Sequence, residues 1–239
     1  MFSLPDLNPP NYEIDISYPI RFLLITVGKD EMSKMERIVR EADPEQKDEM
    51  ACLRALVAEY PTLFAVCRSP ALSELVYHII AKNGPKIVKE LHELLPNCLD
   101  ISFLHRGNTL HLCAKESTAD MVKAILEVEP KLAFSKREID DSLALHHCSS
   151  ADMVGPLVEA YPESVNCRDK YGSTPLHYAA SMIKVDVVAA LLKHGAHTNI
   201  KNNYGNLPVE LPKNKADKQD DIRTIIEMLN DATFTKRAS

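Results

Sequence analysis

The sequence predicts an all-α protein, a solenoid of stacked helix-turn-helix units joined by hairpin-like loops. Three observations predict this class. Residues recur at a nearly fixed period, the apolar positions between them follow helical spacing, and 15 Pro against seven Gly favour helices separated by stiff turns. One such unit is too small to bury its apolar faces alone, so neighbouring units must cover them.

The repeat is clearest near the C-terminus. Gly172 returns as Gly205, and Pro175 returns as Pro208, each 33 residues later. A proline in the first turn of a helix costs no hydrogen bond there, so Pro175 indicates the start of the short first helix of a unit. Self-similarity at such a period is typical of stacked supersecondary units.

Four histidines continue the same repeat upstream. Going backwards they are His177, His146, His111 and His78, separated by 31, 35 and 33 residues. The two irregular steps sum to two periods of 33, which places the length differences in loops, where they are tolerated.

A second pattern predicts the longer second helix of each unit. The segment STADMVKAILEVEP, residues 117–130, returns 32 residues later as SSADMVGPLVEAYP, residues 149–162. Apolar residues such as Met121 and Ile125 are four positions apart and share one helix face. Ser or Thr followed by an acid caps each helix start, and the closing prolines end each helix.

The run from Asp169 to Asn199, with its TPLHYAA motif, resembles the ankyrin repeat. Weaker copies are GNTLHLCA at residues 107–114 and LVYHIIAKNG at residues 75–84, and the resemblance covers roughly residues 45–230. The best copy departs from the family at Ile183, which stands where the family has an inter-helix glycine. Whether this side chain packs inside the stack or contacts a partner stays open.

The expected domain organisation follows the repeat. An extended arm precedes the repeat domain, and a loose polar tail follows it. The boundaries are 1–17 for the arm, 18–232 for the domain (18–61 a degenerate N-terminal cap, 62–206 the main repeats, 207–232 a C-terminal cap with a helix at 221–229) and 233–239 for the tail.

Composition and charge exclude several classes of protein. The net charge of −6 disfavours nucleic-acid binding, which needs a basic face. The N-terminus lacks the pattern of a signal peptide, and no apolar run is long enough to span a membrane. Six cysteines without a CxxC pair indicate reduced thiols and an intracellular, cytoplasmic or nuclear protein. Secretion as a bacterial effector without a cleaved signal stays open.

No motif indicates catalysis, a cofactor or a metal site. The sequence contains no GxSxG, phosphate-binding glycine loop or HExxH. Neighbouring residues of a helix point about 100° apart, so His146 and His147 cannot easily share a zinc ion. In ankyrin repeats the TPLH histidine is structural, which the resemblance implies for all four repeated histidines. A metal-dependent enzyme using the His and Cys positions is kept as the alternative of a different class.

The resemblance implies a concave binding face made of loop tips and the exposed side of the first helices. The tips would be residues 105–106, 136–140, 168–171 and 202–204. The candidate partner-binding residues are Arg106, Leu112, His147, Arg168, Lys170, Tyr171, Tyr178, Met182 and Tyr204. Tyr and Arg are favoured because they often dominate binding energy. The alternative is a structural role, in which the tyrosines only cover neighbouring turns.

The predicted function is non-enzymatic binding of another protein by a monomeric chain. Within that class, an effector or scaffold and a proteasome-assembly chaperone similar to gankyrin are alternatives. Asn166 and Asn199 match a position that asparaginyl hydroxylase modifies in some ankyrin proteins, although a loop Asn that bonds its own turn is the simpler explanation.

Overall fold

The computed structural model describes residues 49–59, 70–96, 98–100, 106–212 and 218–237. The predicted N-terminal arm and most of the predicted N-terminal cap lie outside these ranges, which include only residues 49–59 of the cap. Within them every regular element is a helix, which confirms the all-α prediction. None of the described helices has the length and hydrophobicity needed to cross a membrane.

The α-helices are α3 (Glu49–Glu59), α5 (Pro70–Asn83), α6 (Ile87–Leu94), α7 (Thr109–Glu116), α8 (Ala119–Val128), α9 (Val154–Ala160), α10 (Pro175–Ser181), α11 (Val185–Lys193) and α12 (Gln219–Arg237). The 3₁₀ turns are η1 (Cys98–Asp100), η2 (Pro130–Phe134), η3 (Ala144–His147), η4 (Ala151–Met153), η5 (Pro162–Asn166) and η6 (Pro208–Glu210). Among the described α-helices, α5 and α6, α7 and α8, and α10 and α11 form contacting pairs, and 3₁₀ turns lie between the pairs.

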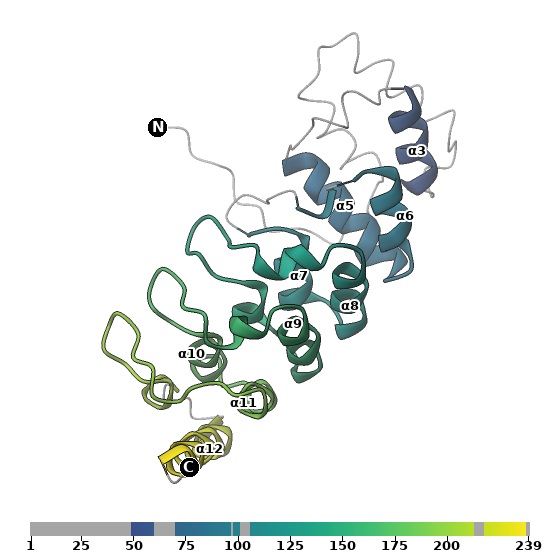
Figure 1. Cartoon of the computed structure of the whole chain (residues 1–239). Helices are drawn as coiled ribbons and strands as arrows, with labels where there is room; N and C mark the ends of the chain where they lie inside the picture. The colour runs from purple at the N-terminus through teal and green to yellow at the C-terminus, as the bar shows by residue number, and fades with distance from the viewer. Residues whose placement is uncertain (1–48, 60–69, 97, 101–105, 213–217, 238–239) are drawn as a thin grey trace, which may run out of the picture.

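The pairs stack in chain order into two helical layers (Figure 1). The second helices form one layer, in which α6 contacts α8, α8 contacts α9, α9 contacts α11, and α11 contacts α12. The first elements form the other, with η3 between α7 and α10, and η6 beyond α10. Three long loops project on the same side of the stack in Figure 1.

A single apolar core runs through the whole stack. It includes Leu56 near one end, Ile125 in the middle and Ile225 near the other end, all with no exposed surface. Cys113 and Cys148 belong to it, and burial raises the pKa of both thiols to about 12. Because only the thiolate is a nucleophile, these two cysteines act as small hydrophobic residues.

Two first helices begin with a reciprocal cap. In α10 the Thr174 N–H donates to Nδ1 of His177 at 3.1 Å, and Pro175 occupies the first turn. In α7 the Asn108 side chain accepts from the His111 N–H at 3.3 Å, while the Asn108 N–H donates to Nδ1 of the same ring. These caps satisfy N–H groups that a helix end otherwise leaves without partners.

The unit between them departs from the predicted helix-turn-helix pattern. Its first element, η3, is a single 3₁₀ turn. In the units of His111 and His177, the residue that caps the next helical element comes seven positions after the histidine. In the unit of His146 it comes only four positions after the histidine. The missing three residues amount to nearly one helical turn, which explains the shortening.

The structure decides the position of Ile183. Its side chain is 4% exposed and belongs to the core, so it packs inside the stack. Its φ of 57° lies in the left-handed region that a glycine adopts easily. The Lys184 N–H bonds the Ala179 carbonyl and the Ile183 N–H bonds that of Ala180, as in a glycine-type helix ending.

Two other sequence predictions need correction. Helix α12 extends to Arg237, so the predicted C-terminal helix of 221–229 is too short, and the predicted tail of 233–239 is helical as far as that residue. His78 is the ninth residue of α5, whereas His111 and His177 are third in α7 and α10. His78 therefore lies well inside its helix and not at the helix start, where His111 and His177 lie.

Candidate functional site

The three projecting loops, here called fingers, are tight turns built on one side-chain oxygen each. The first finger is residues 136–142, the second 168–173 and the third 201–206. In the second, Oδ1 of Asp169 accepts the N–H groups of Tyr171 and Ser173 at 2.9 and 2.7 Å. In the third, Oδ1 of Asn202 does the same for Tyr204 and Asn206, both at 3.0 Å.

The turns also need left-handed backbone positions. Gly172 and Gly205 have φ of 72° and 82° in the second and third fingers, and Asp141 has φ of 58° in the first. Glycine adopts this region without strain, and aspartate tolerates it better than most residues. A Cβ on Gly172 would lie 2.4 Å from Oδ1 of Asn203, which shows how closely the second and third fingers pack.

Main-chain hydrogen bonds join the fingers to one another. The Lys170 N–H donates to the Asp140 carbonyl at 2.8 Å, and the Asn203 N–H donates to the Tyr171 carbonyl at 2.9 Å. Arg168 spans the second and third fingers, with Nη2 3.1 Å from the Lys201 carbonyl. The fingers therefore form one connected, rigid row.

A ladder of histidines holds that row to the helical layers. Nε2 of His111, His146 and His177 bonds the carbonyls of Ser142, Ser173 and Asn206 in the next unit, at 3.1, 3.3 and 3.2 Å. Nδ1 of each ring accepts a backbone N–H of its own unit. Nε2 is thus the donor, and each ring is a neutral clamp between two units.

Burial keeps these rings neutral. Loss of hydration is the main cause that lowers the pKa of His111 and His146 to about 4, and it lowers that of His177 as well. In each of the three rings, both nitrogen atoms form hydrogen bonds within the fold. Among the described residues, no three His, Cys, Asp or Glu side chains gather as they would around a metal ion.

His147 and Tyr178, two candidate binding residues, are half-buried in a polar network. Nε2 of His147 lies 2.8 Å from Oγ of Ser142, which donates to Asp140 at 2.7 Å. The hydroxyl of Tyr178 donates to Asp169 at 2.8 Å. Burial is the largest cause that lowers the pKa of His147, to about 3.

This network resembles a hydrolase triad in composition but not in geometry. Ser142 has no exposed surface, and its hydroxyl proton points to the carboxylate of Asp140 rather than to His147. Asp140 is itself held by Arg137, whose Nε donates at 2.9 Å, and this pairing lowers the pKa of the carboxyl group. A serine without access to substrate or to a free base cannot act as a nucleophile.

Tyr171 and Tyr204 stand free at the tips of the second and third fingers. These two residues are 41% and 71% exposed, and their rings stack with centroids 6.5 Å apart and planes 21° apart. This is a favourable offset arrangement of aromatic rings. Met182, 53% exposed at the end of α10, is the third large apolar candidate in contact with solvent.

Comparison with known proteins agrees with this geometry. Residues 157–211, which include the second and third fingers, match the family model of ankyrin repeats in many copies. These residues form ankyrin repeats.

This chain has ankyrin relatives that are larger and diverse. It is 48% identical over 56 residues to an ankyrin repeat protein of Fowlpox virus, a match covering 22% of this chain and 11% of the viral protein. It is 39% identical over 77 residues to regulatory protein NPR5 of Arabidopsis thaliana, covering 30% and 16% of the two chains. It is 32% identical over 101 residues to human oxysterol-binding protein-related protein 1, covering 41% and 10%. The matches thus span a small part of each relative's length.

One candidate residue of the ankyrin face is misplaced by the sequence analysis. Leu112 is only 1% exposed, because α7 lies inside the stack against η1, α8 and η3, and its residues 109–114 are all buried. Arg106 is exposed, but its guanidinium lies 2.9 Å from Glu116. Lys170 and Arg168 are exposed on the second finger, as expected for its tip.

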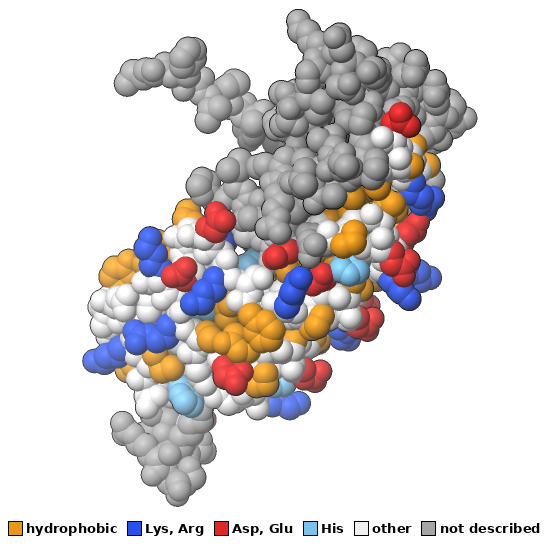
Figure 2. Space-filling view, turned by 45° about the horizontal axis from the view of Figure 1, so that its top comes forward, with side chains coloured by type: hydrophobic (Ala, Val, Ile, Leu, Met, Phe, Trp, Pro, Cys, Tyr) orange, Lys and Arg blue, Asp and Glu red, His pale blue; other side chains and the backbone are white. Residues whose placement is uncertain are grey.

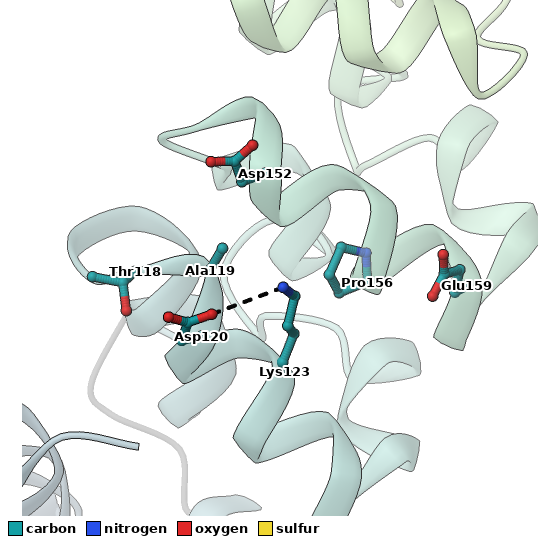
Figure 3. Close-up of a pocket in the computed structure, with 7 residues that line it drawn as sticks. All are labelled: Thr118, Ala119, Asp120, Lys123, Asp152, Pro156 and Glu159. Atoms are coloured by element: carbon teal, nitrogen blue, oxygen red, sulfur yellow. Dashed lines mark ion pairs between the residues drawn. The ribbon is translucent and has the colours of Figure 1, made fainter. Parts of the chain in front are cut away.

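An open hollow between two ankyrin units was not anticipated from the sequence. It has a volume of about 480 Å³ and lies between α8 and the η4–α9 segment (Figure 3). Its walls are mostly polar, and Lys123 pairs with Asp120 at 3.8 Å. The lining residues are Thr118, Ala119, Asp120, Lys123, Asp152, Pro156 and Glu159. They come from two helices 32 residues apart, so only the packing brings them together.

Proposed function

We propose that this chain is a non-enzymatic module that binds another protein through its fingers and the adjoining side of the first helices. The observation that carries the proposal is the stacked, exposed pair of Tyr171 and Tyr204 on a row of hydrogen-bonded fingers. Exposed aromatic rings are costly to leave in water and are enriched among residues that dominate binding.

The rigidity of the fingers supports this role. Each turn is closed by an Asp or Asn side chain, and main-chain bonds tie the turns together. A surface that is already ordered loses little conformational entropy on docking, so more of the contact energy appears as affinity. Of the candidate residues, Tyr171, Tyr204, Lys170 and Met182 are the exposed members on which this proposal rests.

The side-chain chemistry supports a role without catalysis. Burial lowers the pKa of His146 and His147, so both rings are neutral and engaged in the fold. Cys113 and Cys148 have raised thiol pKa values, and Ser142 is enclosed. Zinc analysis of the purified protein tests the metal-enzyme alternative, since a stoichiometric amount of bound zinc would revive it.

Affinity capture from a cell extract tests the proposal, using wild-type chain and a Tyr171→Ala/Tyr204→Ala variant as baits. Phe134→Ala is the matched control, because Phe134 is a 50% exposed aromatic residue outside the fingers. We expect the double variant to lose partners that wild type and the control retain, with all three showing equal helical content. Retention of every partner by the folded double variant would place binding elsewhere.

The same experiment separates the alternatives for the partner. Recovery of proteasomal ATPase subunits would favour a chaperone similar to gankyrin, and recovery of other proteins would favour an effector or scaffold. We propose an intracellular protein, because the five cysteines of the described residues are free thiols and four of them are buried. We also propose that the chain is a monomer. Sedimentation of the purified chain tests the monomeric state.

A further inference from the structure

The stack contains its own example of what a finger binds. The third finger docks on the second through several contacts, of which three show the kinds of group involved. The Asn203 N–H donates to the Tyr171 carbonyl, the cation of Arg168 reaches the Lys201 carbonyl, and the ring of Tyr204 stacks on that of Tyr171. A main-chain acceptor, a cation and an aromatic face are therefore what one finger offers to the next.

The third finger offers the same three groups, one repeat later. Tyr204 occupies the position of Tyr171, and Lys201 occupies the position of Arg168, each 33 residues on. Within the part of the chain that the structure describes, the Tyr204 carbonyl accepts no hydrogen bond and the Lys201 ammonium donates none. Tyr204 is 71% exposed, and Lys201 is exposed as well.

The helical layers, by contrast, are closed at this end. Helix α12 packs on α11 and η6 and continues the apolar core through Ile222, Ile225 and Leu229. The end of the stack is thus capped where it is apolar and open where it is polar. Among the described residues, the outer edge of the third finger is exposed although it carries the same groups that the second finger uses in its contact with the third.

The charges on this edge select the sign of the occupant. The second and third fingers carry three cations, Arg168, Lys170 and Lys201, against one acid. That acid, Asp169, is 6% exposed and is used by its own turn and by Tyr178. In a chain with a net charge of −6, this is a local basic surface (the left edge of the molecule in Figure 2, where Lys and Arg gather).

We infer that the outer edge of the third finger, together with Lys170 and the Tyr171–Tyr204 pair, binds an acidic, extended segment of the partner protein. A main-chain N–H of the segment donates to the Tyr204 carbonyl, as that of Asn203 does to Tyr171. A carboxylate of the segment pairs with Lys201 or Lys170, and a flat apolar side chain stacks on the ring of Tyr204. This inference rests on the proposed function and deepens it.

The test begins with a phage-displayed library of random linear peptides, selected on the full chain. We expect enriched peptides to be acidic and to carry an aromatic residue or proline. No enrichment, or enrichment of neutral or basic peptides, would overturn the inference. So would tighter binding of a polyuridine RNA than of any enriched peptide, or association of the chain with itself that blocks the peptide.

The best peptide is then titrated by fluorescence anisotropy. We expect Lys170→Glu/Lys201→Glu to weaken binding about tenfold or more, since it replaces two attractions with two repulsions. The matched control is Lys193→Glu, which changes an exposed lysine at the end of α11, away from the fingers. We also expect binding to weaken from about 0.05 to about 0.5 M salt, because exposed charges are screened. Equal affinity for wild type and the double variant would contradict the inference.

The failure of this inference is distinguishable from that of the proposed function. If partners captured from the extract are lost with Tyr171→Ala/Tyr204→Ala but kept with Lys170→Glu/Lys201→Glu, the face binds protein and the acidic-segment inference is wrong. If the tyrosine variant also keeps every partner, the proposed function itself falls.

Discussion

Acid should destabilise this protein well above the pH at which its carboxylates protonate. His111 and His146 are buried, His147 is half-buried, and the pKa values of the three rings are lowered from 6.5 to about 4, 4 and 3, so all three are neutral. Below pH 6.5 the unfolded chain binds protons at these positions that the folded chain does not. Their contribution to stability is therefore complete above pH 6.5 and is lost as the pH falls toward 4.

The magnitude follows from the pKa differences. At pH 5 each histidine is about 97% protonated in the unfolded chain and largely neutral in the fold, a cost of about 2 kcal/mol. Three such rings together cost about 6 kcal/mol, comparable with the whole free energy of unfolding of a typical domain. The lowered pKa of His177 acts in the same direction.

Urea denaturation followed by circular dichroism, at about pH 7.5 and about pH 5, measures this loss. His147→Gln should reduce the loss by about a third, because one of the three titrating rings is gone. His197→Gln, which changes an exposed histidine, is the control and should leave the loss unchanged. The reasoning is refuted if the unfolding free energy of wild type falls by less than about 1 kcal/mol over this range.

Four substitutions test other parts of the structure by thermal unfolding. Gly172→Ala should cost more than about 2 kcal/mol, since its φ is left-handed and its Cβ would clash with the third finger, whereas Gly195→Ala, left-handed but in open space, should cost about 1 kcal/mol. An equal effect of both would show that the fingers do not pack as described. Asp141→Gly should stabilise by about 0.5–1 kcal/mol by relieving a left-handed, exposed residue, and a lower melting temperature would contradict this. Leu112→Ala should cost about 2–5 kcal/mol of stability, as expected for a buried leucine. A neutral effect would show that Leu112 is exposed.

The sequence was sufficient for the repeat and for the histidine ladder, because both depend on spacing. His111, His146 and His177 recur at the interval of one unit, and each ring bridges to the next unit. The shortening at η3 was hidden because the step of 35 residues before His146 and the step of 31 after it compensate each other. A deletion inside a helix and an insertion in a loop cancel each other when only the spacing of the histidines is counted.

The proposed binding face was predictable in its tips and less so beneath them. Tyr171 and Tyr204 follow from the turn residues beside them, so their exposure could be anticipated. The burial of Leu112 and the network around His147 depend on which neighbour covers each side chain, which no local pattern specifies. The hydrogen bonds between fingers involve main-chain groups, which every residue type carries, so the sequence gives no sign of them.

The single 3₁₀ turn of η3 has a consequence for how the stack comes apart. The stability of a linear array is the sum of the stabilities of its units and of the contacts between neighbours. Local unfolding therefore begins most easily at the unit with the fewest internal hydrogen bonds. With only one turn between α7 and α10, that unit is η3 and the residues around it. Amide hydrogen exchange should be fastest there among the internal units, dividing the array into an N-terminal half and a C-terminal half that carries both exposed tyrosines.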